Sequence, residues 1–182
     1  LAAYKGEKYI AAQIESIISQ LGENDELIIS DDYPLGKTRD AVSDLIENDE
    51  RIVYIEGPQK GVIKNFEYAI SKARGDYIFL ADQDDVWMPD KVEKVMEVFR
   101  RKKAMVVVHD ARVTDAACKE TLMPSFFVYR HSGRGAIKNI IKNLSKDHTV
   151  IIVAHRLNTI IDSDCIFVLN NHEIIDSGTH NE

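Results

Sequence analysis

The sequence predicts an α/β domain with a mostly parallel sheet, because short apolar runs alternate with segments of helical periodicity up to about residue 110. Three of the apolar runs end in acidic or polar residues, at positions 31–32, 82–85 and 109–110. Parallel α/β sheets bind ligands at the carboxyl ends of their strands. We therefore expect these three strand ends to converge on one edge of the sheet.

The predicted helices and strands follow one another along the chain. Apolar residues three or four positions apart predict helices over residues 10–21, 41–46, 62–73 and 92–99. Continuous apolar runs predict strands over residues 27–30, 52–55, 77–81 and 105–108. Gly75 stands where it would end the third helix, and Pro89 stands where it would start the fourth.

Length and composition limit the class of protein. A chain of 182 residues with 45% hydrophobic residues suits one domain with a real core, or one domain plus an appendage. The net charge of −7 argues against a nucleic-acid binder. No apolar run approaches the roughly 20 residues of a transmembrane helix, and the first residues do not resemble a signal peptide. Because the chain lacks an initiating Met and opens at what resembles a strand end, we expect its natural N-terminus to be missing.

The acidic segment after residues 77–81 is the strongest chemical signal. Asp82, Asp84 and Asp85 place three carboxylates within four residues. Like charges at this spacing repel one another unless a cation lies among them, and carboxylate oxygens favour a hard divalent metal such as Mg²⁺ or Mn²⁺. The alternative is a solvated loop in which one carboxylate caps the next helix.

Residues 4–10, 28–32 and 73–87 together resemble family-two glycosyltransferases of the Rossmann-like GT-A fold, and the rhamnosyltransferase-like branch in particular. The resemblance covers residues 1–143. It implies inverting transfer of a sugar from a metal-bound nucleotide-sugar donor to a saccharide acceptor, in the synthesis of cell-surface polysaccharide. It also implies that Asp32 contacts the nucleotide, that Asp82 and Asp84 form the DxD motif that holds Mn²⁺ or Mg²⁺ and the donor diphosphate, and that Asp85 is a supporting metal ligand.

Three departures from this family affect the expected activity. The family's Asp-Asp-Gly-Ser-Thr segment is replaced by the bulkier residues 31–38, which include Tyr33 and Pro34. Lys5 stands where Asn is usual. The acceptor-side half of the family does not follow residue 143, so the catalytic base, which takes the proton of the acceptor hydroxyl, cannot be assigned to any residue.

The remaining residues, 144–182, resemble the end of an ABC-transporter ATPase domain, with His155 at the place of its switch histidine. We expect a strand over residues 149–154, a short helix and a hairpin around residues 170–171. The predicted organisation is therefore a donor-binding domain over residues 1–143 and an ATPase-like fragment over 144–182, in which His155 has no catalytic role.

Two other functions stay open. The first alternative to a glycosyltransferase is a catalytically inactive scaffold produced by recombination. The second is an ATP-binding module of an ABC transporter. Residues 36–38 imitate the end of a P-loop, with Lys37 as the phosphate contact, but Asp31 stands where that motif needs its first Gly. We expect a cytoplasmic protein. The basic run at residues 100–103, at a predicted helix end, leaves open a peripheral contact with the inner face of the membrane.

Overall fold

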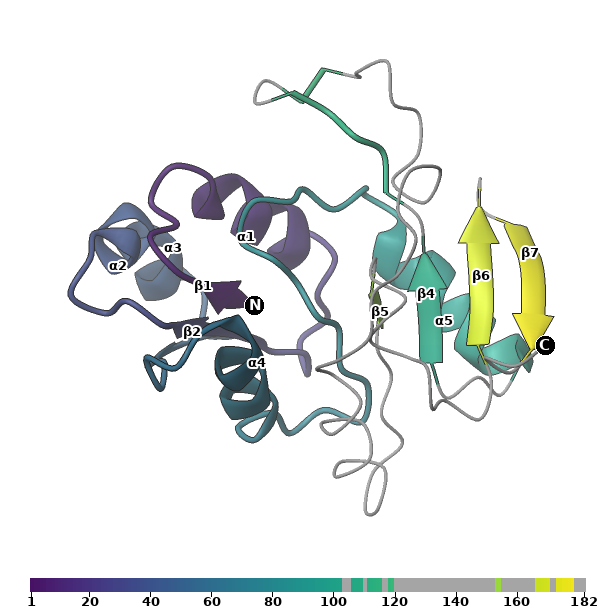
Figure 1. The fold of residues 1–182 in the computed structure, drawn as a ribbon, viewed down its shortest axis with the longest axis horizontal. Coiled ribbons are helices and arrows are strands. Elements are labelled where there is room, and N and C mark those ends of the chain that lie inside the picture. Colours follow the sequence, from purple (N-terminus) through teal and green to yellow (C-terminus); the bar gives the residue numbers. More distant parts are fainter. Residues whose placement is uncertain are drawn as a thin grey trace. The chain divides into compact units, whose positions relative to one another are not determined.

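The structure is a computed structural model, and it describes residues 1–102, 106–109, 111–115, 118–119, 153–154, 166–170 and 173–178. The chain divides into two compact units, Leu1–Lys94 and Val95–Glu182. Each unit contains its own sheet (Figure 1). The α/β class predicted from the alternation of strands and helices is confirmed.

The sheet of the first unit has three parallel strands in the order β1 (Ala2–Ala3), β2 (Leu27–Asp31) and β3 (Ile52–Glu56). The segment before the acidic residues runs along the free side of β1, where Ala2 forms a parallel bridge with Asp82. Across the sheet the order is thus the residue-82 segment, β1, β2 and β3. This is the order of a doubly wound fold, and the chain reverses its direction of progress across the sheet between β1 and Asp82.

The prediction of a strand over residues 77–81 is wrong, because this segment forms no strand and joins β1 only through the bridge at Asp82. At this bridge the Ala2 N–H donates to the Ala81 carbonyl over 3.1 Å. A ladder needs a partner of equal length, and β1 offers two residues. Nor is the segment uniformly buried: Ala81 is, but Tyr77 is 45% exposed.

Two helices cover the two faces of this sheet (Figure 1). The core forms where α1 (Ile10–Ile18) packs its apolar stripe against alternate residues of β2, including Leu27 and Ile29. On the opposite face, α4 (Val62–Ile70) packs against β1 and β2. Asn65 of α4 is buried there and donates to the Ser30 carbonyl over 2.7 Å, so a polar contact ties this helix to β2.

The helix predicted over residues 41–46 is two short helices, α2 (Thr38–Ala41) and α3 (Ser43–Asn48). They meet at Val42, whose φ of −127° lies outside the helical region. Val42 is 1% exposed, so the break between the two helices coincides with a buried residue. The helix predicted over residues 62–73 is also shorter than expected, because α4 ends at Ile70 and Ser71, rather than Gly75, is its C-terminal cap.

The second unit has a four-stranded sheet in the order β5 (Val153–Ala154), β4 (Val106–His109), β6 (Ile166–Asn170) and β7 (Glu173–Gly178). Strand β4 is parallel to both β5 and β6, while β6 and β7 form an antiparallel hairpin. The strand predicted over residues 105–108 and the hairpin predicted around 170–171 are therefore confirmed. The helix α5 (Lys91–Lys102) contains the boundary between the two units. In the part of the chain that the structure describes, no helix has the length and apolar character to cross a membrane.

Candidate functional site

The carboxyl ends of the first unit's strands bring two of the predicted acidic segments to one edge. Asp31 is the last residue of β2, Asp32 follows it directly, and Asp82 lies beside β1. Because adjacent strands are about 4.8 Å apart, β1 separates the backbones of these two segments by about 10 Å. Doubly wound sheets bind ligands where the strand order reverses, which here is between β1 and Asp82.

Asp31 has a structural role. Its side chain is 1% exposed, and its two oxygens accept hydrogen bonds from the Tyr33 backbone N–H at 3.0 Å and the Tyr54 hydroxyl at 2.5 Å. Burial and the hydrogen bond to Asp31 raise the pKa of Tyr54. Both oxygens of this carboxylate thus have a partner, so Asp31 fixes the end of β2 against β3.

Asp32, the predicted nucleotide contact, is held by the loop after β3. Its Oδ2 accepts the Gly61 N–H at 2.7 Å, its Oδ1 lies 3.3 Å from the Lys60 nitrogen, and the residue is 6% exposed. Gly61 is the N-terminal cap of α4, so the carboxylate lies at the positive end of a helix dipole. A carboxylate accepts about four hydrogen bonds, so about half of its capacity remains for a ligand.

Gly57 lies so close to the end of β2 that a side chain at this position would not fit. Its N–H donates to the Asp31 carbonyl over 2.7 Å. A Cβ at this position would lie 2.9 Å from the Asp31 backbone and 2.5 Å from Oδ1 of Asn65. The same Asn65 oxygen accepts from the Ser30 hydroxyl at 2.6 Å. Backbone and buried polar groups therefore pack tightly around the end of β2.

The predicted metal ligands have different surroundings. Asp82 is half-buried, whereas Asp84 and Asp85 are exposed. Within the described ranges, no three His, Cys, Asp or Glu side chains are close enough together to hold a metal ion. The donor set still fits Mg²⁺ or Mn²⁺, which proteins often bind through one or two carboxylates, with water and substrate phosphate as the other ligands.

Lys91 is a residue near the acidic segment that the sequence analysis did not identify. Its ammonium group lies 4.1 Å from the centre of the Trp87 ring. Burial lowers the pKa of Lys91 to about 8, and the negative charges of Asp85 and Asp82 oppose that shift. A cation beside the carboxylates reduces their mutual repulsion. In the sequence, the only feature that pointed to Lys91 was its position two residues after Pro89.

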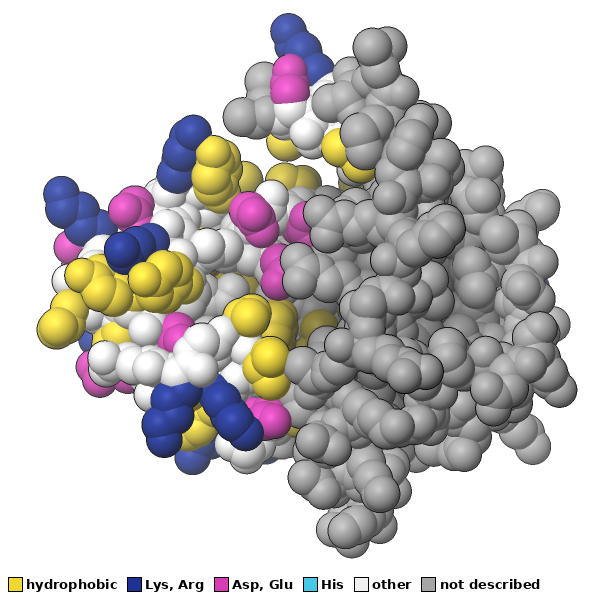
Figure 2. Space-filling model, in the orientation of Figure 1, with side chains coloured by type: hydrophobic (Ala, Val, Ile, Leu, Met, Phe, Trp, Pro, Cys, Tyr) yellow, Lys and Arg dark blue, Asp and Glu magenta, His cyan; other side chains and the backbone are white. Residues whose placement is uncertain are grey.

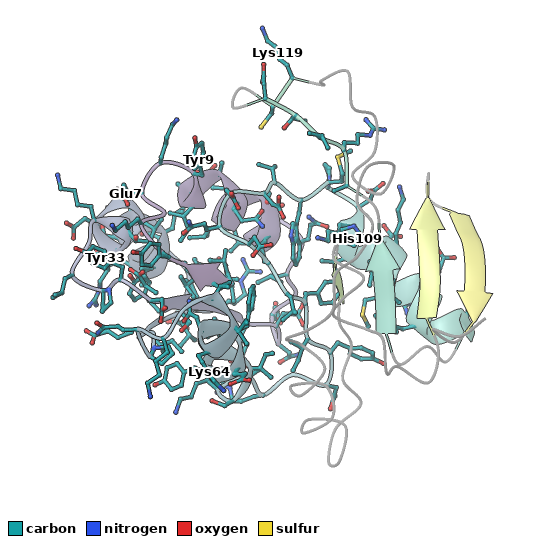
Figure 3. All side chains as sticks on the ribbon, in the orientation of Figure 1. Glu7, Tyr9, Tyr33, Lys64, His109 and Lys119 are labelled. Atoms are coloured by element: carbon teal, nitrogen blue, oxygen red, sulfur yellow. The ribbon has the colours of Figure 1, made fainter. Side chains whose placement is uncertain are left out.

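Exposed aromatic residues lie at the ends of β1 and β2. The rings of Tyr4 and Tyr33 meet edge to face with 5.8 Å between centroids, and the ammonium group of Lys5 lies about as close to each ring, at 5.3 and 4.9 Å. Figure 3 labels Tyr33 in the loop after β2. Figure 2 shows exposed hydrophobic side chains on this part of the molecule. The substituted loop after Asp32 therefore contributes an aromatic surface beside the site.

The other predicted positions belong to other parts of the chain. His109 ends β4 in the sheet of the second unit, while Asp110 and His155 lie outside the described residues. In the P-loop-like segment, Thr38 is fully buried and its hydroxyl accepts the Gly6 N–H at 3.1 Å, which is a structural contact. Lys37 precedes a helix of only four residues.

Comparison with known proteins assigns the family. The model of glycosyl transferase family 2 matches residues 1–157. The chain is 35% identical over 97 residues to the putative teichuronic acid biosynthesis glycosyltransferase TuaG of Bacillus subtilis, which is 52% of this chain and 38% of that protein. It is 33% identical over 104 residues to the Escherichia coli enzyme WfaP, named as a UDP-Glc:alpha-D-GlcNAc-diphosphoundecaprenol beta-1,3-glucosyltransferase, which is 57% of this chain and 41% of that enzyme.

A third similarity is to a protein of another kind. Over 47 residues, 26% of this chain, the identity is 49% to 8% of an ATP-dependent lipid A-core flippase of Photobacterium profundum. The chain spans less than half the length of each of these three curated relatives. The family model covers most of the chain, and the parallel sheet with its acidic strand ends agrees with it. The chain therefore belongs to glycosyl transferase family 2.

Proposed function

We propose that the first unit binds a nucleotide-sugar donor, as part of an inverting glycosyltransferase that makes cell-surface polysaccharide. The proposal rests on two acidic segments at the point where the strand order reverses: Asp32 follows β2 directly, and Asp82 lies on the other side of β1. One relative is named as a putative teichuronic acid biosynthesis glycosyltransferase, and another as a glucosyltransferase that acts on a diphosphoundecaprenol-linked sugar.

In this proposal the two segments hold different parts of the donor. Asp32 accepts hydrogen bonds from the nucleoside, because its carboxylate is fixed by Gly61 and retains free acceptor capacity. Asp82 and Asp84, supported by Asp85, bind Mn²⁺ or Mg²⁺ with the diphosphate. When bound, such a metal neutralises the negative charge of the leaving nucleoside diphosphate. The acceptor is a saccharide, and its catalytic base is not assigned to any residue of this chain.

The experiment is a calorimetric titration of the purified chain with a panel of nucleoside diphosphates, with and without Mn²⁺. The matched variant carries Asp82→Ala and Asp84→Ala together. Metal-dependent binding by the wild type that the double variant loses supports the proposal. If no diphosphate binds in the presence of Mn²⁺, or if the double variant binds as well as the wild type, the proposal is wrong and the inactive scaffold is the better account.

For the C-terminal part we propose an ABC-ATPase-like fragment over residues 144–182, joined to the donor domain of residues 1–143. The similarity to a flippase supports this, because that protein is named as ATP-dependent. The hairpin of β6 and β7 agrees with the tail expected from the sequence. In this proposal the chain is a chimera and His155 is not catalytic. ATP binding that is lost in a His155→Ala or Lys37→Ala variant would contradict this and favour an ATP-binding module.

We further propose that the protein is cytoplasmic and contacts the inner face of the membrane only peripherally. The name of the WfaP relative, whose acceptor is a diphosphoundecaprenol-linked sugar, supports an acceptor at a membrane surface. Sedimentation of the chain with vesicles that contain anionic lipid tests the contact. Sedimentation at physiological salt supports it, and a chain that stays in the supernatant contradicts it.

A further inference from the structure

The acidic loop, defined here as residues 82–87, is attached to the rest of the first unit by side chains. The first attachment comes from Gln13, a completely buried residue of α1. Its Nε2 donates to the Asp82 carbonyl over 3.0 Å. Burying an amide is unfavourable unless both its ends have partners. Here Oε1 has one as well, because the Ser16 hydroxyl lies 3.1 Å from it.

Ser16 makes the second attachment, at the other end of the loop. Its Oγ accepts the Trp87 N–H at 2.9 Å. The Ser16 hydroxyl proton is directed at Gln13, whose carbonyl oxygen and Oε1 lie 2.7 and 3.1 Å from Oγ. Residues 13 and 16 are neighbours on one helix face, because they are three positions apart. One face of α1 thus holds both the first and the last residue of the acidic loop.

Gln83 makes the third attachment, to the chain just after β1. Its Oε1 accepts the Tyr4 N–H at 2.8 Å, and its Nε2 donates to the Tyr4 carbonyl over 2.9 Å. This side chain makes the two hydrogen bonds that a neighbouring strand would make with residue 4. The contact requires Gly6, because a Cβ there would lie 2.2 Å from the Gln83 oxygen.

These hydrogen bonds reach the loop at residues 82, 83 and 87, and residues 84–86 are exposed. We propose that Gln13, Ser16 and Gln83 are positioning residues, which hold the Asp82 and Asp84 carboxylates in place for the metal-bound diphosphate of the donor. This inference rests on the proposed function. Loss of an attachment lets the loop move, so the carboxylates no longer meet the metal and the diphosphate together.

The test uses four single variants of the full chain. Gln13→Leu and Ser16→Ala each remove one attachment, while Ser16→Thr keeps the hydroxyl. The matched control is Gln20→Leu. Gln20 follows α1 and also makes two amide hydrogen bonds, to the Ser16 carbonyl at 2.8 Å and from the Val92 N–H at 3.1 Å, but neither involves the acidic loop.

Two measurements separate a positioning role from a structural one. The first needs no ligand: Trp87 is the sole tryptophan of the chain, so its fluorescence and the hydrogen exchange of residues 82–87 report on the loop. The second is the Mn²⁺ concentration that half-saturates binding of a nucleoside diphosphate, compared with the affinity for the same diphosphate without metal. We expect Gln13→Leu and Ser16→Ala to expose Trp87 to quenchers and to raise the half-saturating Mn²⁺ concentration about tenfold. The metal-free affinity should change less than about twofold, and Ser16→Thr and Gln20→Leu should resemble the wild type.

The outcomes are distinct. Unchanged fluorescence and exchange in both Gln13→Leu and Ser16→Ala overturn the proposal, whether or not any nucleotide binds. A loosened loop with an unchanged Mn²⁺ requirement also overturns it, because the attachments are then only structural. If the wild type binds no nucleoside diphosphate, the proposed function is wrong, and so is any positioning role toward a donor. If the wild type binds and its variants keep the same Mn²⁺ requirement, only this inference is contradicted.

Discussion

Asp32 and Asp84 belong to the same edge of the first unit, but their carboxylates have opposite surroundings. Asp32 is 6% exposed and accepts hydrogen bonds from the backbone of Gly61 and Lys60. Asp84 is exposed, and it makes no hydrogen bond or ion pair with any residue of the described part of the chain. The first carboxylate is stabilised by the fold itself. The second is an uncompensated charge beside Asp82 and Asp85, so it is free to bind a cation.

The two ends of the proposed donor site are therefore held by the protein in different ways. At the nucleoside end, backbone N–H groups hold the Asp32 carboxylate in place. At the diphosphate end, the fold holds the loop through Gln13, Ser16 and Gln83, and Asp84 is exposed. Mutations at the first end should therefore reduce stability, and mutations at the second should reduce ligand binding.

The largest effect on stability should come from Gly57→Ala. Its new methyl group would lie 2.9 Å from the Asp31 backbone, which cannot move without disturbing β2. We expect a loss of about 3 kcal/mol in the free energy of unfolding, measured by urea denaturation. Gly75→Ala is the control, since the nearest atom there is 3.5 Å away, and it should change stability by less than about 0.5 kcal/mol. Equal effects of the two variants would contradict the tight packing that we describe.

Asp32→Ala and Asp84→Ala should affect stability differently, because only the Asp32 carboxylate is held by backbone N–H groups. The first leaves the Gly61 and Lys60 N–H groups without their acceptor, and it should cost about 2 kcal/mol of stability. The second removes an exposed charge and should change stability by less than about 0.5 kcal/mol. Urea denaturation of both variants under one set of conditions checks this. A destabilising Asp84→Ala would show that the acidic loop is part of the folded core.

A pH dependence follows from the contact between Tyr54 and Asp31. Because burial and Asp31 raise the pKa of Tyr54 in the folded protein, its contribution to stability is complete below the unfolded value of about 10 and is lost as the pH rises beyond it. Tyr54→Phe should cost about 1–2 kcal/mol at pH 7 and should lessen the loss of stability above pH 10. Urea midpoints at pH 7, 9 and 10.5 measure both effects. Parallel pH profiles for the wild type and the variant would contradict the assigned shift.

The smallest expected effect is a gain in stability from Lys5→Asn. Lys5 has a φ of +50°, a backbone conformation that Asn adopts more readily than Lys. Relief of this strain should raise the melting temperature slightly, by an amount equivalent to about 0.5–1 kcal/mol. Lys8→Asn is the control, because Lys8 does not have a positive φ. A Lys5→Asn variant that is no more stable than Lys8→Asn would show that contacts of Lys5 with Tyr4 and Tyr33 outweigh the strain.

The parts of the fold that local sequence determines were predictable. The strands β2 and β3 appear as apolar runs because their residues pack in the sheet, and the acidic ends follow directly from them. The segment at 77–81 could not be predicted correctly, because whether an apolar run forms a strand depends on the length of its partner, here two residues. The break at Val42 depends on burial of one side chain, which apolar periodicity does not reveal.

The candidate site was predictable only in its carboxylates. Asp32, Asp82 and Asp84 stand in recognisable motifs, whereas Gln13 contacts a residue 69 positions away and Ser16 one 71 positions away. Such pairs come together only in the folded chain. A buried glutamine on an apolar helix stripe was the available signal, since an amide in the core must have a partner.

The two acidic segments should differ in their need for metal, and one thermodynamic cycle measures this difference. The affinity for a nucleoside diphosphate is measured for the wild type, Asp32→Ala, Asp84→Ala and the double variant, each with and without Mn²⁺. We expect Asp32→Ala to weaken binding in both conditions, and Asp84→Ala to weaken it only when Mn²⁺ is present. Weaker binding by Asp84→Ala without metal, or unchanged binding with it, would show that the acidic loop does not act through the metal.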